Sequence, residues 1–553
     1  MRVQFTARKS LVNVPFSVAL FLLVSCASCL AAAAATAPLF RLVVSYGSGG
    51  TGASSVAVAD VNGDGKQDLV VANICASTTD CSMGSVAVLL GNGDGTFQTA
   101  ATHGSGGQGA TSIAVGDLNG DGNPDLAVAN SSSPQVGVLL GNGDGTFRPV
   151  QIYPSGGLGT SSVAIADVNG DGKLDLLIVN CGTCGVPEAV AGVLLGNGDG
   201  TFQPVRTISL QRYYSRSIAV ADVNGDGKPD LVMSFFDSCP TLSGCDTGGV
   251  GVLLGNGDGT FQPPQIYNSE IYGVSAVAVA DLNGNGRPDV IMGGSCLTFS
   301  ACRSGDLGVL LDNQAHTFQP AAGYGSGGVN VLSVAVADVN GDGKPDLLVV
   351  NECPFSDCFN QAVVGVLLGK GDGTFQKATT FSSGGYLGHG IAVGDLNGDG
   401  RTDLVVANLC TGEFSCDNED GTVSGSGLIG VLLNNTPFCT TPPVITVSTS
   451  VVSLWPPNGK MTPVTVSGRI TDIGCAVKTA TYGVTDEYGE VQPKGTLTVG
   501  PAGNYSFIIL LQASRLGDDQ DGRRYTITVR ASTNAGNSGS STTAVVVPHD
   551  QAH

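Results

Sequence analysis

The sequence predicts an all-β protein in which a seven-bladed β-propeller, closed by an N-terminal strand, is followed by an immunoglobulin-like β-sandwich. Two observations predict this fold. The motif Asp-[Val/Leu]-Asn-Gly-[Asp/Asn]-Gly-x-x-Asp occurs seven times, at intervals of 57, 50, 55, 59, 57 and 57 residues, and such a period indicates one repeated supersecondary unit. After the last copy the period stops, and alternating apolar runs continue toward the C-terminus. The predicted parts are a signal peptide (1–37), the propeller (38–437) and the sandwich (438–553).

Each repeat is predicted to contain four short strands. From Ser112 the chain contains SIAVGD, LAVAN and VGVLLG, which are apolar or alternating runs. TFRPVQIY follows, and its proline suits an edge strand. Gly-Asn-Gly-Asp-Gly is a hairpin-type turn between the last two strands. Because one small sheet cannot bury both of its faces, we expect seven such meanders to stack around an axis as blades.

The two ends of the repeat array are complementary. The last repeat lacks the usual GDGTF strand, and an unassigned strand, LFRLVVSY at 39–46, precedes the first repeat. We expect residues 39–46 to pair with 428–433 and to close the ring, which would hide an exposed sheet edge. The up-and-down order then puts the Asp motifs and the Gly-Asn-Gly-Asp-Gly turns on one face. The Cys-bearing loops and the Ser-Gly-Gly crossovers fall on the opposite face, which varies between repeats.

The Asp motifs predict a metal site in every repeat. Hard cations such as calcium take six to eight oxygen ligands from alternating positions of a tight loop. Side chains at motif positions 1, 3, 5 and 9, with the carbonyl of position 7, can supply them. The alternative is a plain β-turn composition, but three carboxylates within nine residues repel one another unless a cation is bound. The fifth copy has Asn285 at position 5, so we expect it to be the weakest site. The predicted ligands are Asp60, Asn62, Asp64, Lys66 and Asp68; Asp117, Asn119, Asp121, Asn123 and Asp125; Asp167, Asn169, Asp171, Lys173 and Asp175; Asp222, Asn224, Asp226, Lys228 and Asp230; Asp281, Asn283, Asn285, Arg287 and Asp289; Asp338, Asn340, Asp342, Lys344 and Asp346; and Asp395, Asn397, Asp399, Arg401 and Asp403.

With these motifs, the repeats resemble the FG-GAP/VCBS-type repeats of integrin α-subunit propellers and of many secreted bacterial proteins. The resemblance covers about residues 39–437 and rests on DxNGDGxxD followed by GNGDGTF in most copies. It implies a seven-bladed propeller with calcium in the Asp loops, up to seven ions and one per blade. It also implies that proteins or glycans are recognised mainly on the face opposite those loops.

The N-terminal residues are typical of an export signal. A basic start precedes an apolar run from about Val14 to Val24 and small residues that end at Ala37. Leu23-Val24-Ser25-Cys26 resembles a bacterial lipobox, so Cys26 is an alternative lipidation site. We therefore expect a bacterial protein that is secreted or at the cell surface, with a lipid-anchored outer-membrane form as the alternative. Membrane contact is expected only with that anchor.

The remaining fourteen cysteines fall into seven pairs, and after an export signal an even count argues for disulfides. Cys181-Gly-Thr-Cys184 alone would also fit a redox motif or half a zinc site. Because corresponding pairs in five other repeats are spaced by five or six residues, a loop disulfide is favoured. The predicted pairs are Cys75/Cys81, Cys181/Cys184, Cys239/Cys245, Cys296/Cys302, Cys353/Cys358, Cys410/Cys416 and Cys439/Cys475.

The net charge of −21 disfavours binding to nucleic acid, but 25 of the 46 acidic residues lie in the Asp motifs and the later Gly-Asp-Gly turns. Two further groups of residues are candidates for a ligand site. One recurs fourteen residues before each motif, where packing between blades is the favoured interpretation and sugar stacking the alternative; its members are Tyr46, His103, Tyr153, Ile208, Tyr267, Tyr324 and Phe381. The other consists of interruptions of the repeat, for which plain surface decoration is the favoured interpretation; these are Arg212, Tyr213, Tyr214 and Arg216, then Phe235 and Phe236, and the acidic loop 411–421.

No catalytic residue is predicted, because the chain lacks a nucleophile elbow, a phosphate loop and a zinc-binding His spacing. We expect a monomeric, non-catalytic recognition or adhesion protein for an extracellular glycan or protein. The alternative is a carbohydrate-active enzyme of the polysaccharide lyase type, for which the cluster around Arg216 is the available candidate site.

The C-terminal segment is predicted to form about seven strands. The runs VITVSTS, TPVTVSGRI, VKTATYGVT, YSFIILLQ, RYTITVRAS and TAVVVP alternate in polarity, as expected for a sandwich. Arg523 and Tyr525 belong to a stretch that resembles the tyrosine corner of secreted bacterial immunoglobulin-like modules.

Overall fold

The computed structural model describes residues 39–181, 189–210, 212, 214–236, 247–294, 306–313, 317–354, 361–412, 425–436, 442–471, 477–490, 492–500, 503–514, 516–517, 522–533 and 537–549. The named elements within these ranges are all β-strands, which confirms the predicted all-β class. The predicted signal peptide, including Cys26, lies outside the described residues.

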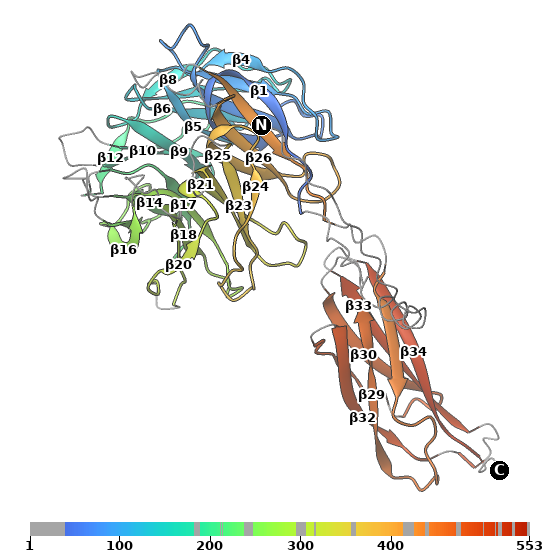
Figure 1. Ribbon diagram of the computed structural model, residues 1–553. Helices are drawn as coiled ribbons and strands as arrows, with labels where there is room; N and C mark the ends of the chain where they lie inside the picture. The colour runs from blue at the N-terminus through green and yellow to red at the C-terminus, as the bar shows by residue number, and fades with distance from the viewer. Residues whose placement is uncertain are drawn as a thin grey trace, which may run out of the picture. The chain divides into compact units, whose positions relative to one another are not determined.

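The repeat region consists of small antiparallel sheets that follow one another in chain order (Figure 1). Five of them are separate four-stranded meanders. Their strands are β5 (Ala110–Gly116), β6 (Asp125–Asn130), β7 (Gln135–Leu139), β8 (Gln151–Pro154); β9 (Thr160–Ala166), β10 (Asp175–Asn180), β11 (Val190–Leu194), β12 (Arg206–Ser209); β13 (Ile218–Ala221), β14 (Asp230–Phe235), β15 (Thr247–Leu253), β16 (Gln265–Tyr272); β17 (Val274–Ala280), β18 (Asp289–Gly294), β19 (Asp306–Leu310), β20 (Ala322–Gly325); and β21 (Val329–Ala337), β22 (Asp346–Cys353), β23 (Val363–Leu367), β24 (Thr379–Ser382).

The first and last repeats share a seven-stranded sheet in the order β25-β26-β27-β1-β2-β3-β4. The strand β1 is long enough to belong to both repeats. Val44 to Gly47 pair with residues 431 to 428 of β27, and the later part of β1 pairs with β2. An isolated bridge joins Phe40 to Asn434. The predicted pairing of 39–46 with 428–433 is therefore confirmed. These strands are β1 (Val44–Ala59), β2 (Asp68–Cys75), β3 (Ser85–Leu89), β4 (Ala101–Gly104), β25 (Tyr386–Gly394), β26 (Asp403–Cys410) and β27 (Ser426–Leu432).

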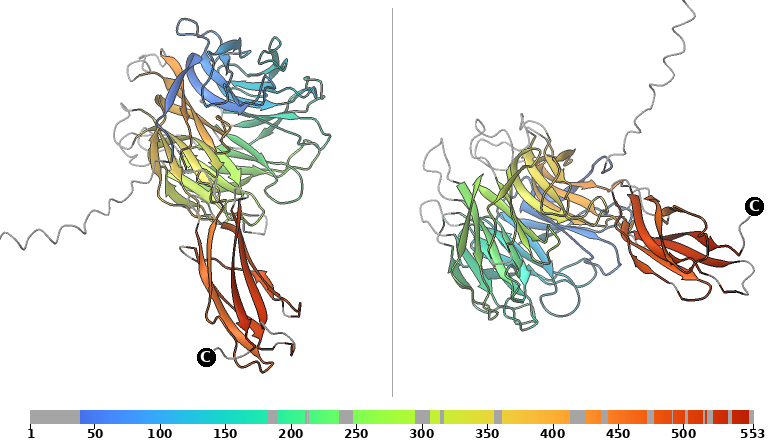
Figure 2. Two further views of the ribbon diagram at one scale, coloured as in Figure 1. Left: turned by 90° about the vertical axis from the view of Figure 1, so that its right-hand side faces the viewer. Right: turned by 90° about the horizontal axis from the view of Figure 1, so that it is seen from below.

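The first strand of each sheet contacts the first strand of the next, from β1 with β5 through to β21 with β25, and β25 also contacts β1. The second strands are buried along most or all of their length because each sheet packs between its neighbours. In β6, for example, every residue from Asp125 to Asn130 is buried. The repeat region is thus a β-propeller-like array, and Figure 2 shows its sheets from two further sides.

The predicted fourth strand is shorter than expected. Of the run TFRPVQIY, only Phe147 forms an isolated bridge, with Gly141, and regular pairing starts again at Gln151 in β8. Pro149 separates the two parts, since proline has no N–H for a ladder hydrogen bond. Four of the third strands, β7, β11, β23 and β27, carry a glycine where a crossover passes over them. At Gly430 in β27, an added Cβ would lie 1.8 Å from the carbonyl oxygen of Ser383.

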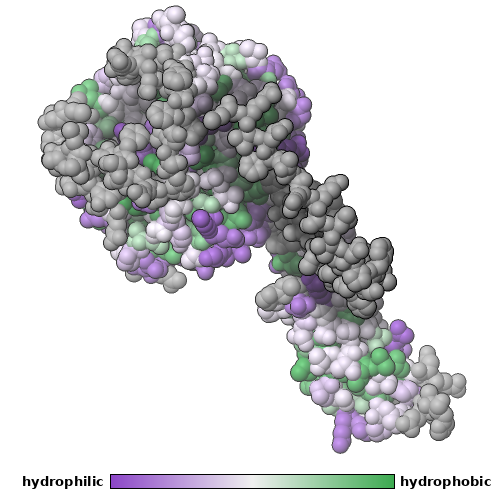
Figure 3. All heavy atoms as spheres, in the orientation of Figure 1, coloured by the Kyte–Doolittle hydropathy of each residue, from purple (hydrophilic) through white to green (hydrophobic). Residues whose placement is uncertain are grey.

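The C-terminal strands form two sheets, β28-β29-β32 and β31-β30-β33-β34, that share one apolar core. Val464 and Ile509 of the first sheet pack with Ile527 and Val545 of the second, which is the packing of a β-sandwich. Apolar side chains also reach the surface of this region (Figure 3), and Ile508 is 66% exposed. The strands are β28 (Val444–Thr449), β29 (Met461–Thr471), β30 (Val477–Asp486), β31 (Lys494–Thr496), β32 (Asn504–Gln512), β33 (Arg523–Thr533) and β34 (Ser538–Val547).

The predicted tyrosine-corner stretch is a hydrogen-bonded anchor of this sandwich. The Tyr525 hydroxyl donates to the Gln512 carbonyl at 2.9 Å. Arg523 is completely buried and pairs with the equally buried Asp486 at 3.0 Å. Burying a charge is tolerated only with such a partner, so Arg523 is structural. The narrower immunoglobulin-like assignment stays a prediction.

Candidate functional site

The seven Asp loops share one hydrogen-bonded geometry. In the first loop the backbone N–H of Asp64 donates to Asp60 Oδ1 at 3.1 Å and to Asn62 Oδ1 at 3.0 Å, so the two oxygens converge on one N–H. Asp60 Oδ2 accepts from Gly65, and Asp64 Oδ1 accepts from Lys66. The glycines at positions 4 and 6 have positive φ in all seven loops, which other residues rarely adopt. The side-chain oxygens of positions 1 and 3 therefore meet at the backbone N–H of position 5.

Position 9 has a different surrounding from positions 1, 3 and 5. Asp68 is completely buried; its Oδ2 accepts from Val61 at 3.0 Å and its Oδ1 from Gly91 at 2.7 Å. The equivalent aspartate in every loop makes the same two bonds, so we call these seven residues the latch aspartates: Asp68, Asp125, Asp175, Asp230, Asp289, Asp346 and Asp403. They tie each Asp loop to the end of the third strand of the same sheet.

Burial controls the ionisation of the latch aspartates. Loss of solvent, with a smaller contribution from the other aspartates of each loop, raises the pKa of all seven. For Asp346 and Asp403 the pKa rises to about 6. The neighbouring carboxylates add to this rise in pKa, because a nearby negative charge disfavours ionisation of the latch aspartate.

Part of that repulsion is offset within the chain. Lys66 Nζ lies 3.4 Å from Asp64 Oδ2, and position 7 makes the same pair in the third, sixth and seventh loops. Among the residues that the structure describes, no three His, Cys, Asp or Glu side chains form a metal-holding group. The carboxylate and amide oxygens of positions 1, 3 and 5 nevertheless have the hard-donor chemistry that calcium prefers. The donor set fits a calcium ion that also uses backbone carbonyl or water oxygens.

The Gly-Asn-Gly-Asp-Gly turns do more than reverse the chain. Asp94 accepts from both the N–H and the hydroxyl of Thr96, and the N–H of Gly95 donates to the carbonyl of Leu396 in the last repeat. Corresponding bonds run from Gly145, Gly200, Gly259 and Gly373 to the preceding Asp loop. Each such turn therefore joins two sheets. Sequence reasoning missed this role, since the acceptor lies in another repeat.

The recurring aromatic positions pack between sheets, as the favoured interpretation predicted. Tyr46 meets Phe97 edge to face with ring centroids 5.5 Å apart, and Tyr153 meets Phe202 at 5.2 Å. His103, Tyr267, Tyr324 and Phe381 make equivalent contacts. Ile208 packs into the apolar core beside the third and fourth sheets.

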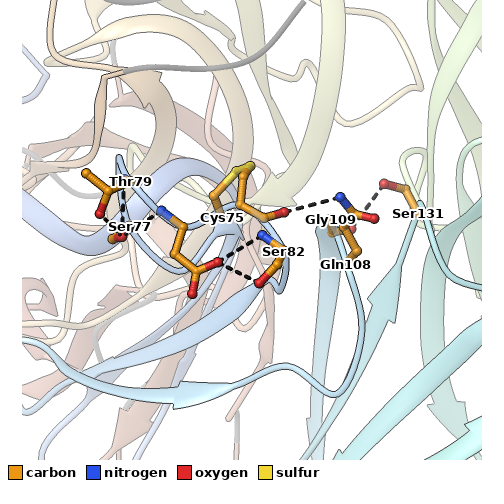
Figure 4. Close-up of a disulfide and its surroundings, with 9 residues drawn as sticks. Cys75, Ser77, Thr79, Ser82, Gln108, Gly109 and Ser131 are labelled. Atoms are coloured by element: carbon orange, nitrogen blue, oxygen red, sulfur yellow. Dashed lines mark hydrogen bonds between the residues drawn. A yellow bond between two sulfur atoms is a disulfide. The ribbon is translucent and has the colours of Figure 1, made fainter.

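The first Cys-bearing loop lies beside the following crossover, as expected. Cys75 and Cys81 form the predicted disulfide, and the Cys81 carbonyl accepts from Gln108 Nε2 of the following crossover (Figure 4). Cys353 and Cys410 are also disulfide-bonded. The pairing of Cys181 is untested, because its predicted partner lies outside the described residues. The same holds for Cys184, Cys239, Cys245, Cys296, Cys302, Cys358, Cys416, Cys439 and Cys475.

A pocket of about 810 Å³ opens where the first strands begin, at the end opposite the Asp loops. We call it the central pocket, because all seven repeats contribute to it. Most of its lining consists of hydroxyl side chains, together with Tyr214, Arg216, Phe236 and His389. This combination of a concave surface and a few convergent polar groups is typical of a ligand site.

The fourth-repeat cluster predicted from sequence contributes directly to the central pocket. The Tyr214 ring stacks on Phe236 with centroids 5.0 Å apart and planes 14° from parallel, and the Arg216 guanidinium lies over Phe236 at 5.6 Å. Arg212 lies over Phe235 at 4.8 Å, outside the pocket lining. Tyr213 lies outside the described residues.

His389 is the pocket residue that the sequence did not reveal. Its Nδ1 lies 2.8 Å from the Ser54 carbonyl oxygen, which can only accept, so Nδ1 carries a proton. Burial, aided by the charge of Arg216, lowers the pKa of His389, whereas Glu352 opposes this shift. This shift favours the neutral imidazole, in which Nε2 carries no proton.

Comparison with known proteins identifies the repeats. The FG-GAP-like repeat model matches residues 73–128, 117–178, 187–233, 241–292, 298–349 and 358–406, and a related FG-GAP repeat model matches 52–73 and 215–253. No curated protein sequence matches the chain. Among solved structures, the chain is similar to the crystal structure of the V. cholerae biofilm matrix protein Bap1, with 15% identity, a TM-score of 0.33, and coverage of 72% of this chain and 91% of that one. The part of the chain that the structure describes has no helix with the length and hydropathy of a membrane span.

Proposed function

The chain belongs to the FG-GAP-like repeat family, and from this premise we propose that it is a non-catalytic recognition or adhesion protein for an extracellular glycan or protein. The observation that carries the proposal is the central pocket, whose hydroxyl, aromatic and guanidinium groups converge on the variable face. Stacking platforms and hydroxyl groups suit sugars, and an accessible arginine suits either class of ligand.

A binding screen of the full chain against glycan and extracellular-protein panels tests this function. Ser162→Trp should plug the pocket and reduce binding at least tenfold, whereas Lys173→Ala, on the Asp-loop face, should leave binding unchanged. Arg216→Ser gives a second pocket variant that adds no bulk. Matching thermal melts separate loss of binding from loss of folding, and binding that survives both pocket variants contradicts the proposed site.

We further propose that the Asp loops hold calcium, up to seven ions and one per loop, with a stabilising role. The proposed ligands are the side chains of positions 1, 3 and 5 together with backbone oxygens, because the predicted ligand at position 9 already accepts two backbone N–H bonds. One bound calcium ion would supply two positive charges to the carboxylates of each loop. A ligand that binds only the folded state raises the melting temperature, so chelation should lower it by many degrees. An unchanged melt would falsify this proposal.

A second function, polysaccharide lyase activity, is favoured by one observation: Tyr214, Arg216 and His389 line the same pocket. In a β-elimination, a base takes the proton α to a uronate carboxylate, the bond to the leaving oxygen breaks, and a C=C bond forms. Neutral His389 could act as base and the Tyr214 hydroxyl could protonate the leaving oxygen, with Arg216 neutralising the carboxylate. Incubation with a polyuronate, followed by ultraviolet absorbance of new unsaturated ends, separates the two functions.

We also propose export, since the cysteine pairs require an oxidising compartment. The mass of the mature N-terminus distinguishes cleavage after Ala37 from lipidation of Cys26. A cytoplasmic location with reduced Cys75 and Cys81 would contradict export.

A further inference from the structure

The rim of the central pocket follows a repeat register in which four repeats carry Ser or Thr and three do not. One position at the start of each first strand is occupied by Ser54, Thr111, Ser161, Arg216, Ser275, Leu332 and His389. Where it is Ser or Thr, the hydroxyl donates to a backbone carbonyl of the next sheet. These bonds join Ser54 to Ala110 at 2.7 Å, Thr111 to Thr160 at 3.2 Å, Ser161 to Ser215 at 3.1 Å and Ser275 to Val331 at 2.6 Å. The position therefore has a structural role, which is to fasten neighbouring sheets.

The two charged or ionisable replacements differ in what they do. His389 keeps the fastening bond, through Nδ1 to the carbonyl of Ser54. Arg216 instead lies exposed at the pocket, with its guanidinium over Phe236. The fourth sheet thus exchanges an inter-sheet hydrogen bond for a cation at the pocket. Positions that break a local structural rule in this way are where function is expected.

The surroundings of Arg216 favour an anion. The described residues that line the pocket include no carboxylate, although the chain has 46 acidic residues. Within the described part of the chain, no carboxylate lies within ion-pair distance of Arg216. A guanidinium fork binds carboxylate and sulfate groups well.

We infer that the central pocket binds an anionic saccharide, with Arg216 holding its carboxylate or sulfate group. Tyr214, stacked on Phe236, offers a flat aromatic surface for the sugar ring, and the Ser and Thr side chains surround it with hydrogen-bonding groups. The volume falls in the range of small-molecule sites, which suits a few sugar units. This inference rests on the proposed recognition function and names its ligand class.

The test is a calorimetric titration of the calcium-loaded full chain with three probes: an α-1,4-linked tetragalacturonate, its methyl ester and a sulfated tetrasaccharide. The two anionic probes distinguish carboxylate from sulfate. Wild-type protein should bind one of them at least tenfold more tightly than the neutral ester. Arg216→Ser should remove that preference, and Arg216→Lys should restore part of it. Arg212→Ser, which changes a neighbouring arginine outside the pocket, is the matched control and should bind like wild type.

Serine is the residue that three other repeats carry at this position, so Arg216→Ser should fold and keep or raise the melting temperature. The inference is overturned if the ester binds as tightly as the acids, if Arg216→Ser keeps the preference, or if no anionic probe binds. In each case, binding of a neutral glycan or a protein that Ser162→Trp abolishes leaves the proposed recognition function standing. Loss of all pocket-dependent binding removes both.

Discussion

The latch aspartates provide the sharpest test of how the Asp loops stabilise the fold. Asp175 is completely buried and accepts from Val168 at 2.9 Å and Gly196 at 2.8 Å. Asp175→Ala leaves two buried N–H groups without an acceptor, each costing about 1–3 kcal/mol, so the summed loss is about 2–6 kcal/mol. Relief of a poorly solvated carboxylate offsets part of this, and we expect a net loss of about 3 kcal/mol. Asp175→Asn keeps one acceptor oxygen and should lose about half as much.

Asp171, in the same loop, is the matched control. It is partly exposed and pairs with Lys173 at 3.9 Å, a kind of pair worth about 0–1 kcal/mol. Urea unfolding with a chelator present should show at least twice the loss for Asp175→Ala as for Asp171→Ala. With calcium added, Asp171→Ala should gain less stability than Asp175→Ala, because position 5 is a proposed calcium ligand. Equal losses in the chelator would refute the distinction between a buried latch and an exposed loop carboxylate.

Three further predictions concern stability. The pKa of Asp346 and Asp403 is raised from 3.8 to about 6, so the folded state binds more protons than the unfolded state between these two pH values. With a chelator present, the melting temperature of wild type relative to the Asp346→Asn variant should therefore fall as the pH rises from about 4 to 6 and then level off. A rise of this difference over the same window would contradict the pKa shift. Gly430→Ala forces a Cβ against a carbonyl oxygen and should lower the melting temperature clearly, while Gly325→Ala, where nothing lies within 4 Å, should not; similar melts for both would count against a close approach of the crossover to Gly430. Arg523→Ala removes the cation that pairs with the buried Asp486 carboxylate and should cost about 3–5 kcal/mol in the C-terminal sandwich. Calorimetry should show a shift confined to that domain's transition, and a change below about 1 kcal/mol would show that the ion pair is dispensable.

Much of the fold could be predicted from the sequence because the local pattern of each repeat indicates its strands and turns. The period, the alternating runs and the missing last strand together predicted the pairing of residues 39–46 with 428–433, across nearly the whole array. The exception was the fourth strand, which Pro149 divides. The sequence contains a proline there, but it does not reveal that regular strand pairing starts again only at Gln151.

The candidate site was predicted less completely, and the reason is geometric. Spacing placed Asp68 in the Asp loop, but its second hydrogen-bond donor, Gly91, lies 23 residues further on. Nothing local indicates that the side chain turns inward. The presence of an aspartate at position 9 even in the fifth copy, where position 5 becomes Asn285, is the signal that could have separated a structural carboxylate from a ligand.

The central pocket could not be predicted as a cavity, since all seven repeats contribute to its wall. Two of its residues nevertheless stand out when the repeats are compared with one another. Arg216 was singled out because it interrupts the fourth repeat, and the structure brings it together with Tyr214 and Phe236. His389 occupies the same register position in the seventh repeat and was missed, because only the first strands aligned against one another reveal it.

The central claim is that ligand recognition and metal-dependent stability belong to opposite faces of the propeller. Hydrogen exchange of the calcium-loaded full chain, with and without a bound anionic tetrasaccharide, tests it most directly. We predict slower exchange at residues 214–217 and 389–390, around the central pocket, and no change in the Asp loops, including 60–68 and 167–175. Protection confined to the Asp loops, with none at the central pocket, would contradict the account.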